Sequence, residues 1–141
     1  MASGLYDLGR GHFLDGNIDW SANTIKCFLI DSGAYTVNLA TDEHAANTPT
    51  GDIPAAAKIA TSAALTAKTS TNGVADAADV TFSSVTGATV EAIVVYVDGA
   101  TPGTDDYLIA YIDNAPEFPV TPNGGDITVT WDSGANKIFK L

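Results

Sequence analysis

The sequence predicts a mainly β protein, an antiparallel β-sandwich or jelly roll forming a single domain with one short N-terminal helix. Turn signals separate short apolar runs about every 8–12 residues, as in such folds. Asp outnumbers Glu by fourteen to three. Asp favours turns and strand ends, because its short side chain binds nearby backbone N–H groups. No second amphipathic helix follows the first, which argues against an alternating α/β sheet.

The chain divides into an N-terminal helical segment, residues 1–22, and a β-domain, residues 23–141. Apolar residues in the helical segment recur at a spacing that forms one stripe along a helix. We expect this stripe to be buried against the β-domain or against another protein. The residues of this candidate partner interface are Leu5, Tyr6, Phe13 and Leu14.

The N-terminal helix is expected to be marginal on its own. Ser3 is the expected N-cap and Gly16 the expected stop. Gly9 and Gly11 lie inside the helix and each cost about 1 kcal/mol relative to Ala. The helix should therefore become ordered only by packing.

From Thr24 onward the hydrophobic period is two, or the apolar residues form short runs, as is typical of strands. The runs at Ala92–Val97 and Leu108–Ile112 are almost continuously apolar, which predicts central strands covered on both faces. Asn72-Gly73 is the strongest hairpin signal. The expected strands lie within 24–31, 35–41, 58–76, 79–85, 89–99, 107–113, 127–131 and 137–141.

Two further segments complete the prediction. Residues 42–58 are polar and broken by Pro and Gly, which indicates a long loop. Strand 127–131 alternates cleanly, so Ile127, Val129 and Trp131 should point inward. Asp126 and Asp132 flank this strand as turn residues, and 137–141 should return beside it as the closing strand.

The composition argues against several classes of partner. The net charge is -11, with only six Lys and Arg residues in 141. A protein that binds phosphate backbones needs a basic patch, so nucleic acid is not expected as a partner. An anionic membrane surface would repel the chain, and no apolar run approaches the roughly 20 residues that span a bilayer. No secretory signal is visible, so we expect a soluble protein made in a cytoplasm.

Cys27 is the only cysteine, which excludes a disulfide framework and a cysteine-based zinc site. Ile25, Cys27 and Leu29 share one face of a strand in this reading. The thiol is therefore expected to pack as a small hydrophobic group.

No catalytic constellation is visible, and we expect neither an enzyme nor a cofactor. His44 lies in the long loop and should be exposed, whereas His12 is a candidate interface residue. Glycoside hydrolysis needs a pair of carboxylates, and the sequence does not identify a second carboxylate that would pair with Glu91. The chain lacks a G-x-S-x-G motif, a P-loop and a CxxC pair.

A weak calcium site is the remaining metal hypothesis. Asp98, Asp105 and Asp106 are close in sequence and could supply oxygen ligands, but the EF-hand spacing and its Glu are missing. The alternative is a solvated turn. No metal is therefore assigned to the chain.

Several segments resemble small structural proteins of tailed bacteriophages and prophages, and the resemblance spans essentially the whole chain. The final segment is the most specific of them. The resemblance departs mainly in the loops 44–50 and 98–106, so contact residues cannot be carried over there. The segments are "MASGLYDLGRGHFLDGNIDW", "YTVNLATDEH", "TNGVADAADVTF", "LIAYID" and "PVTPNGGDITVTWDSGANKIFKL".

The resemblance implies a virion component. A small acidic β-domain suits a capsid decoration, or cement, protein on the capsid exterior, made in the host cytoplasm. Its partners would be the major capsid protein and copies of itself, commonly as a trimer. Such a protein gains strength from many repeated modest interfaces.

Two other functions remain open at this point. One is a tail or fibre-associated module that binds a host surface glycan or protein through aromatic side chains and long loops. The other is a calcium-dependent lectin-like domain unconnected to phage. Copy number per particle separates the first from a cement protein, and calcium-dependent stability would reveal the second.

Overall fold

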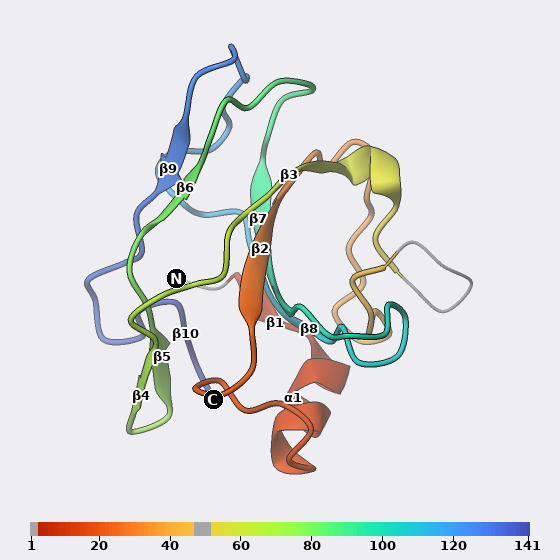
Figure 1. Cartoon of the computed structure of the whole chain (residues 1–141), viewed down its shortest axis with the longest axis vertical. Helices are drawn as coiled ribbons and strands as arrows, with labels where there is room; N and C mark the ends of the chain where they lie inside the picture. The colour runs from red at the N-terminus through yellow and green to blue at the C-terminus, as the bar shows by residue number, and fades with distance from the viewer. Residues whose placement is uncertain (1–2, 47–51) are drawn as a thin grey trace.

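The computed structural model describes residues 3–46 and 52–141. As expected, the described chain is mainly β, with antiparallel sheets and one short N-terminal α-helix (Figure 1). In chain order the elements are β1 (Gly4–Leu5), α1 (Asp7–Leu14), β2 (Ile25–Ile30), the 3-10 helix η1 (Ala55–Ala57), β3 (Lys58–Thr61), β4 (Thr69–Thr71), β5 (Val74–Asp76), β6 (Val80–Phe82), β7 (Ala92–Val97), β8 (Leu108–Ile112), β9 (Ile127–Val129) and β10 (Phe139–Lys140).

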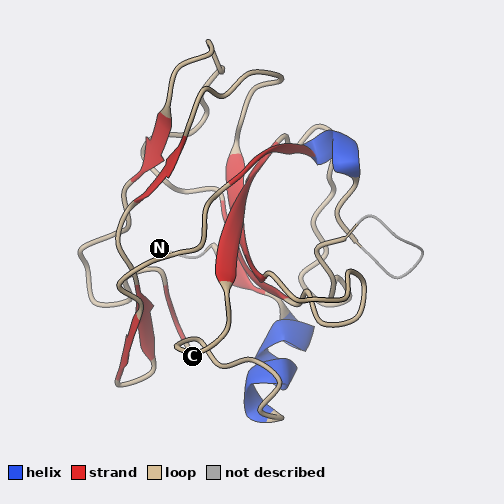
Figure 2. Ribbon diagram, viewed as in Figure 1, coloured by secondary structure: helices blue, strands red, loops and turns tan. Residues whose placement is uncertain are grey.

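The strands form three separate antiparallel sheets (Figure 2). The largest has the order β1-β8-β7-β2-β3, so β1 and β3 are its edges. A three-stranded sheet has the order β10-β5-β4, and β6 pairs only with β9. The two smaller sheets lie on one side of the large sheet (Figure 1).

The central strands of the large sheet are covered on both faces. Every residue of β7 and β8 is buried. Because successive side chains of a strand point to opposite faces, Ile93 and Val95 join one apolar cluster while Val94 and Tyr96 join the other. The expectation drawn from their continuous apolar runs is confirmed.

The first cluster fills the space between the large sheet and the two small sheets. It contains Ile25, Cys27 and Leu29 of β2, which share a face as expected. From the opposite side, Phe82 and Trp131 contribute to the same cluster. The Trp131 indole Nε1–H donates to the Ala78 carbonyl at 2.9 Å, so its polar atom is satisfied within this apolar layer.

The second face is covered by irregular chain between β2 and β3. Tyr35 and Ile53 from this connection pack on the second cluster. The expected strand at 35–41 is wrong: no strand forms there. Asn38 starts a turn instead, because its side-chain oxygen accepts the Ala40 N–H at 3.1 Å and its carbonyl accepts the N–H of Asp42 at 2.9 Å. Such local bonds compete with a strand ladder.

The expected long loop at 42–58 is partly confirmed. Its described residues are irregular apart from η1 and the start of β3. Residues 47–51 lie outside the described part of the chain.

The hairpin predicted at Asn72-Gly73 is confirmed. β4 and β5 pair on either side of it, with φ angles of +54° and +78° at the two turn residues. Positive φ at both central positions is the turn geometry that fits the twist of a two-residue hairpin.

The C-terminal stretch differs from the expected hairpin. Ile127, Val129 and Trp131 are buried as expected. However, β9 pairs with β6, and β10 pairs with β5 rather than with β9. The alternation of a strand fixes which face is buried but does not identify the neighbouring strand.

The two carboxylates around β9 both accept backbone N–H groups, Asp132 within its own turn as predicted and Asp126 from a segment 42 positions away. Asp126 Oδ1 accepts the Ser84 N–H, and Asp132 Oδ1 accepts the Gly134 N–H, both at 2.9 Å.

Helix α1 begins one turn later than expected. Its N-cap is Tyr6 rather than Ser3, and the Ser3 hydroxyl instead accepts the Asp113 N–H at 2.9 Å. The helix ends as predicted, with φ of +77° at Gly16. Gly9 is buried where α1 crosses β8, and a Cβ on it would lie 2.2 Å from the Leu108 carbonyl oxygen. This glycine therefore permits the close approach of the helix to the sheet.

Substituting the two helix glycines should have opposite effects. Gly9→Ala should lower the free energy of unfolding by about 1–3 kcal/mol, because the new methyl group meets the backbone of β8. Gly11→Ala should raise it by up to about 1 kcal/mol, because nothing lies within 4 Å of its added Cβ and Ala is the better helix former. Urea denaturation of both variants measures the difference, and equal destabilisation by the two would contradict the close approach.

Candidate partner-binding surface

A groove of about 350 Å³ lies where α1, β1 and β10 meet. Its lining combines apolar side chains with two cations: Leu5, Arg10, Phe13, Leu14, Lys140 and Leu141. Because β1 and β10 are edge strands of two different sheets, the groove marks the place where the two sheets do not join.

The fold positions the apolar side chains of the groove. Leu5 is fixed by the pairing of β1 with β8, opposite Ala110. Phe13 is partly buried, and its ring lies 6.0 Å from that of Phe139 in β10. Leu14 is the last residue of α1 and is 88% exposed. The groove thus combines partly buried apolar side chains held by the fold with an exposed leucine at the end of α1.

Three of the four residues of the expected interface line this groove: Leu5, Phe13 and Leu14. Tyr6 does not, because it is 0% exposed and belongs to the second core cluster. Its hydroxyl lies 3.0 Å from that of Tyr35, and burial raises the pKa of Tyr6 above its ordinary value. Tyr6 therefore holds the irregular chain between β2 and β3 to the large sheet and cannot touch a partner in this conformation.

Sequence reasoning missed the C-terminal contribution to the groove. Lys140 and Leu141 come next to α1 only because β10 pairs with β5 beside the edge of the large sheet. No periodic pattern connects residues so far apart in the chain. The apolar residue Leu141 at the end of the expected last strand weakly indicates an apolar contact there. It does not identify the element that makes the contact.

The two cations of the groove are the least compensated of the described basic side chains. Arg10 lies 3.7 Å from Asp7 on the same helix, and both side chains are more than half exposed. Such a surface pair contributes little. Lys140 forms no ion pair with any described residue.

The other lysines are engaged within the chain. Lys26 pairs with Asp98 at 2.7 Å, and Lys137 lies 3.9 Å from Asp76. Lys58 and Lys68 donate to backbone carbonyls, and burial lowers the pKa of both ammonium groups. The most exposed of the described ion pairs, Arg10–Asp7, and the unpaired Lys140 therefore both lie at the groove.

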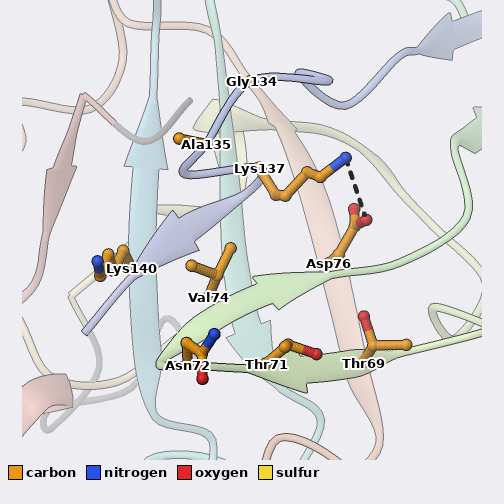
Figure 3. Close-up of a pocket in the computed structure, with 9 residues that line it drawn as sticks. All are labelled: Thr69, Thr71, Asn72, Val74, Asp76, Gly134, Ala135, Lys137 and Lys140. Carbon is orange, nitrogen blue, oxygen red and sulfur yellow. Dashed lines mark ion pairs between the residues drawn. The ribbon is translucent and has the colours of Figure 1, made fainter.

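A second hollow of about 440 Å³ adjoins the groove and shares Lys140 with it (Figure 3). Hydroxyl and amide groups from β4 and the hairpin turn line it, including those of Thr69, Thr71 and Asn72. The Lys137–Asp76 pair crosses one end of this hollow (Figure 3). Its lining holds no aromatic side chain, and Val74 is the largest apolar one, so it offers less apolar surface than the groove.

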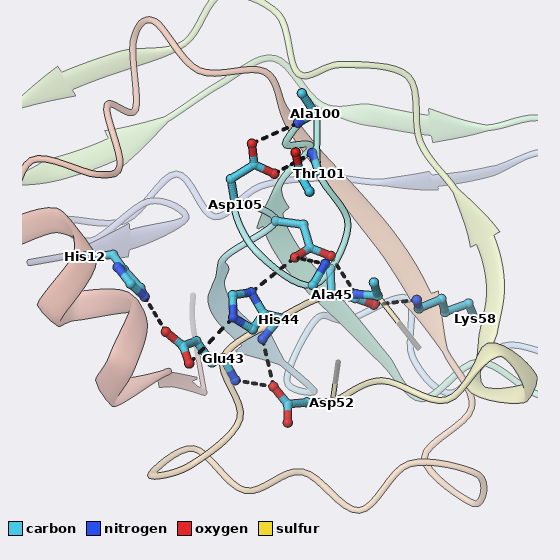
Figure 4. A network of polar contacts seen from close by, with 12 residues as sticks. His12, Glu43, His44, Ala45, Asp52, Lys58, Ala100, Thr101 and Asp105 are labelled. Atoms are coloured by element: carbon cyan, nitrogen blue, oxygen red, sulfur yellow. Dashed lines mark hydrogen bonds and ion pairs between the residues drawn. The ribbon is translucent and has the colours of Figure 1, made fainter. Parts of the chain in front are cut away.

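A chain of polar contacts links α1 to the irregular loops (Figure 4). His12 Nε2 lies 2.8 Å from Glu43 Oε1, and His44 Nδ1 lies 3.1 Å from Asp106 Oδ1. The expectation that His44 is exposed is wrong: it is only 8% exposed. Asp106 also accepts the Ala46 N–H at 2.7 Å, which holds the loop around His44 against the segment that leads into β8.

His12 is only partly accessible, because its ring stacks on that of Tyr107 at 3.7 Å. Together with its bond to Glu43, this contact places His12 inside the chain's own polar network and outside the groove lining.

The three aspartates of the calcium hypothesis are occupied by contacts within the chain. Asp98 pairs with Lys26, Asp105 accepts the Thr101 N–H at 2.7 Å, and Asp106 faces His44. Among residues 3–46 and 52–141, no group of three His, Cys, Asp or Glu side chains is arranged to hold a metal ion. These contacts are those of acidic turn residues.

Glu91 likewise serves a local contact. Its Oε2 accepts the Ser32 N–H at 2.9 Å. This bond ties the turn after β2 to the start of β7.

In the described part of the chain, no helix has the length and apolar character needed to cross a bilayer. No protein-family model matches the sequence, and neither does any curated protein. The described residues define a β-rich domain with an apolar groove whose lining includes two cations.

The contacts of Asp106 predict a large effect of removing its carboxylate. Asp106→Ala should lower the free energy of unfolding by about 2–4 kcal/mol, because the buried His44 and Ala46 N–H groups lose a charged acceptor. The matched change at exposed Asp15 should cost less than about 0.5 kcal/mol. Chemical denaturation measures both, and similar values would contradict the anchoring role.

The Cys27 thiol should be inert in the folded chain. Burial raises its pKa above the ordinary value, opposed by a hydrogen bond with Ser62, and the residue is fully buried. Because the thiolate is the reactive species, a thiol reagent at pH 8 should modify Cys27 only after unfolding. Prompt modification of a Leu8→Cys variant at one site provides the control, and prompt modification of the wild-type chain would contradict the burial.

Proposed function

We propose that this chain is a non-enzymatic virion structural protein of a tailed phage, a capsid decoration protein that binds and stabilises the lattice of the major capsid protein. The groove is the proposed surface of attachment to the capsid, because an exposed leucine lies there beside partly buried apolar side chains. The sequence resemblance to phage structural proteins supports the assignment of the chain to a virion. In this proposal the protein sits on the capsid exterior as an oligomer, commonly a trimer.

The fold suits attachment to a lattice. We further propose that the five-stranded sheet and the two small sheets are the two layers of a sandwich related to the jelly roll, with the first apolar cluster between them. A rigid β-core presents a fixed binding surface and loses little conformational freedom on binding. Many such modest contacts across a lattice add up to strong attachment.

Charge is consistent with one-sided binding. The chain carries a net charge of -11, while Arg10 and Lys140 rim the groove. Attachment through the groove leaves the acidic remainder of the surface facing solvent, where high net charge favours solubility.

Virion composition tests the proposal. In purified particles, a decoration protein should give a gel band comparable in amount to the major capsid protein. Leu14→Asp should reduce this occupancy several-fold, because a carboxylate replaces an apolar contact of the groove. Leu8→Asp, a matched change on α1 outside the groove lining, should leave occupancy unchanged.

The same measurement separates the alternatives. A few copies per particle would overturn the decoration assignment in favour of a tail or fibre-associated module. Absence of the chain from purified particles would contradict any virion role. Thermal unfolding of both Leu variants beforehand checks that each is folded.

A further inference from the structure

We propose that the groove binds an extended segment of another protein that carries apolar side chains and at least one carboxylate. The inference deepens the proposed function and rests on it, since it describes the partner segment that enters the attachment surface. Three observations identify this occupant: the edge strands, the exposed leucines, and two cations of which one is weakly paired and the other unpaired with any described residue.

The edge strands define the shape of the occupant. β1 ends the large sheet and β10 ends the three-stranded sheet, and residues of both line the groove. Edge strands readily receive an additional extended chain, whose alternate side chains then enter neighbouring pockets. A segment lying between β1 and β10 would bridge the gap between two sheets.

The exposed leucines define its apolar part. Three large hydrophobic side chains are exposed in the described chain: Leu8 at 39%, Leu14 at 88% and Leu141 at 55%. Leu14 and Leu141 both line the groove, together with the partly buried Leu5 and Phe13. The volume of about 350 Å³ is at the small end of the range for ligand pockets, about 300–1,000 Å³. It fits a few side chains of a segment.

The cations define its charge. Arg10 and Lys140 stand at the rim, and neither has a strong ion pair with a described residue. A carboxylate on the incoming segment would find both within one groove, and electrostatic complementarity of this kind selects partners.

A second copy of this chain is a poorer occupant than a different protein. A two-fold symmetric contact through the groove would bring the Arg10 and Lys140 side chains of both copies into one small patch without adding a carboxylate from the groove lining. Contacts between copies in the proposed oligomer would therefore use another surface.

Two labelled synthetic peptides of equal length test the inference with the full chain. Both alternate Leu and Val with charged residues, one peptide having Glu at every charged position and the other Lys. Fluorescence anisotropy should show binding of the Glu peptide and at least tenfold weaker binding of the Lys peptide. Binding of the Glu peptide should weaken in about 1 M salt, where the Debye length is about 3 Å.

Variants locate the site. Leu14→Asp and the double variant Arg10→Glu/Lys140→Glu should each weaken binding of the Glu peptide about tenfold or more, equivalent to at least 1.4 kcal/mol. Leu8→Asp introduces the same charge on the same helix and should leave the affinity within twofold of wild type.

Three results would overturn the inference. They are no binding of the Glu peptide, equal binding of the Glu and Lys peptides, and equal effects of Leu14→Asp and Leu8→Asp. The peptide experiment uses the isolated chain and no virions. A negative result would therefore overturn the inference about the groove, while the copy number in virions would still test the proposed function separately.

Discussion

The structure depends on burying three neighbouring strands, β2, β7 and β8, on both faces. Strands with apolar side chains on both faces need a cover on each side. The small sheets supply one cover, with Trp131 and Phe82 in the shared cluster. Irregular chain between β2 and β3 supplies the other, with Tyr35 and Ile53. The position of α1 follows from the same requirement, because its buried Gly9 rests on the backbone of β8.

The two covers are held by different forces, and this difference explains the acidic composition. Strand pairing and apolar packing fix the small sheets. The described residues between β2 and η1 form no strand and must satisfy their backbone groups in other ways. Aspartates perform this role: Asp42 accepts from Tyr35 and from the Asn38 N–H, and Asp52 and Asp106 accept loop N–H groups. The many carboxylates that first invite a catalytic or metal interpretation therefore serve largely to fold loops.

Features set by local chemistry could be predicted from the sequence, whereas features set by distant neighbours could not. Continuous apolar runs identified β7 and β8, and Asn72-Gly73 identified a hairpin. Periodicity could not reveal that β10 pairs with β5. It likewise could not show that His44 is buried, because its partner Asp106 lies 62 positions away. Leu14 was expected at an interface, but its neighbour Lys140 enters the groove only through that strand pairing.

The long-range pairing of the large sheet also orders events during synthesis. β1 adds to β8, and the Ser3–Asp113 hydrogen bond beside that pair closes a separation of 110 positions. β2 ends at Ile30 and its partner β7 at Val97. The 67 residues between those ends take about 3–13 s to translate at about 5–20 residues per second. Throughout that interval the emerging chain carries an apolar strand without its central partner, and exposed apolar strands of this kind are prone to aggregate.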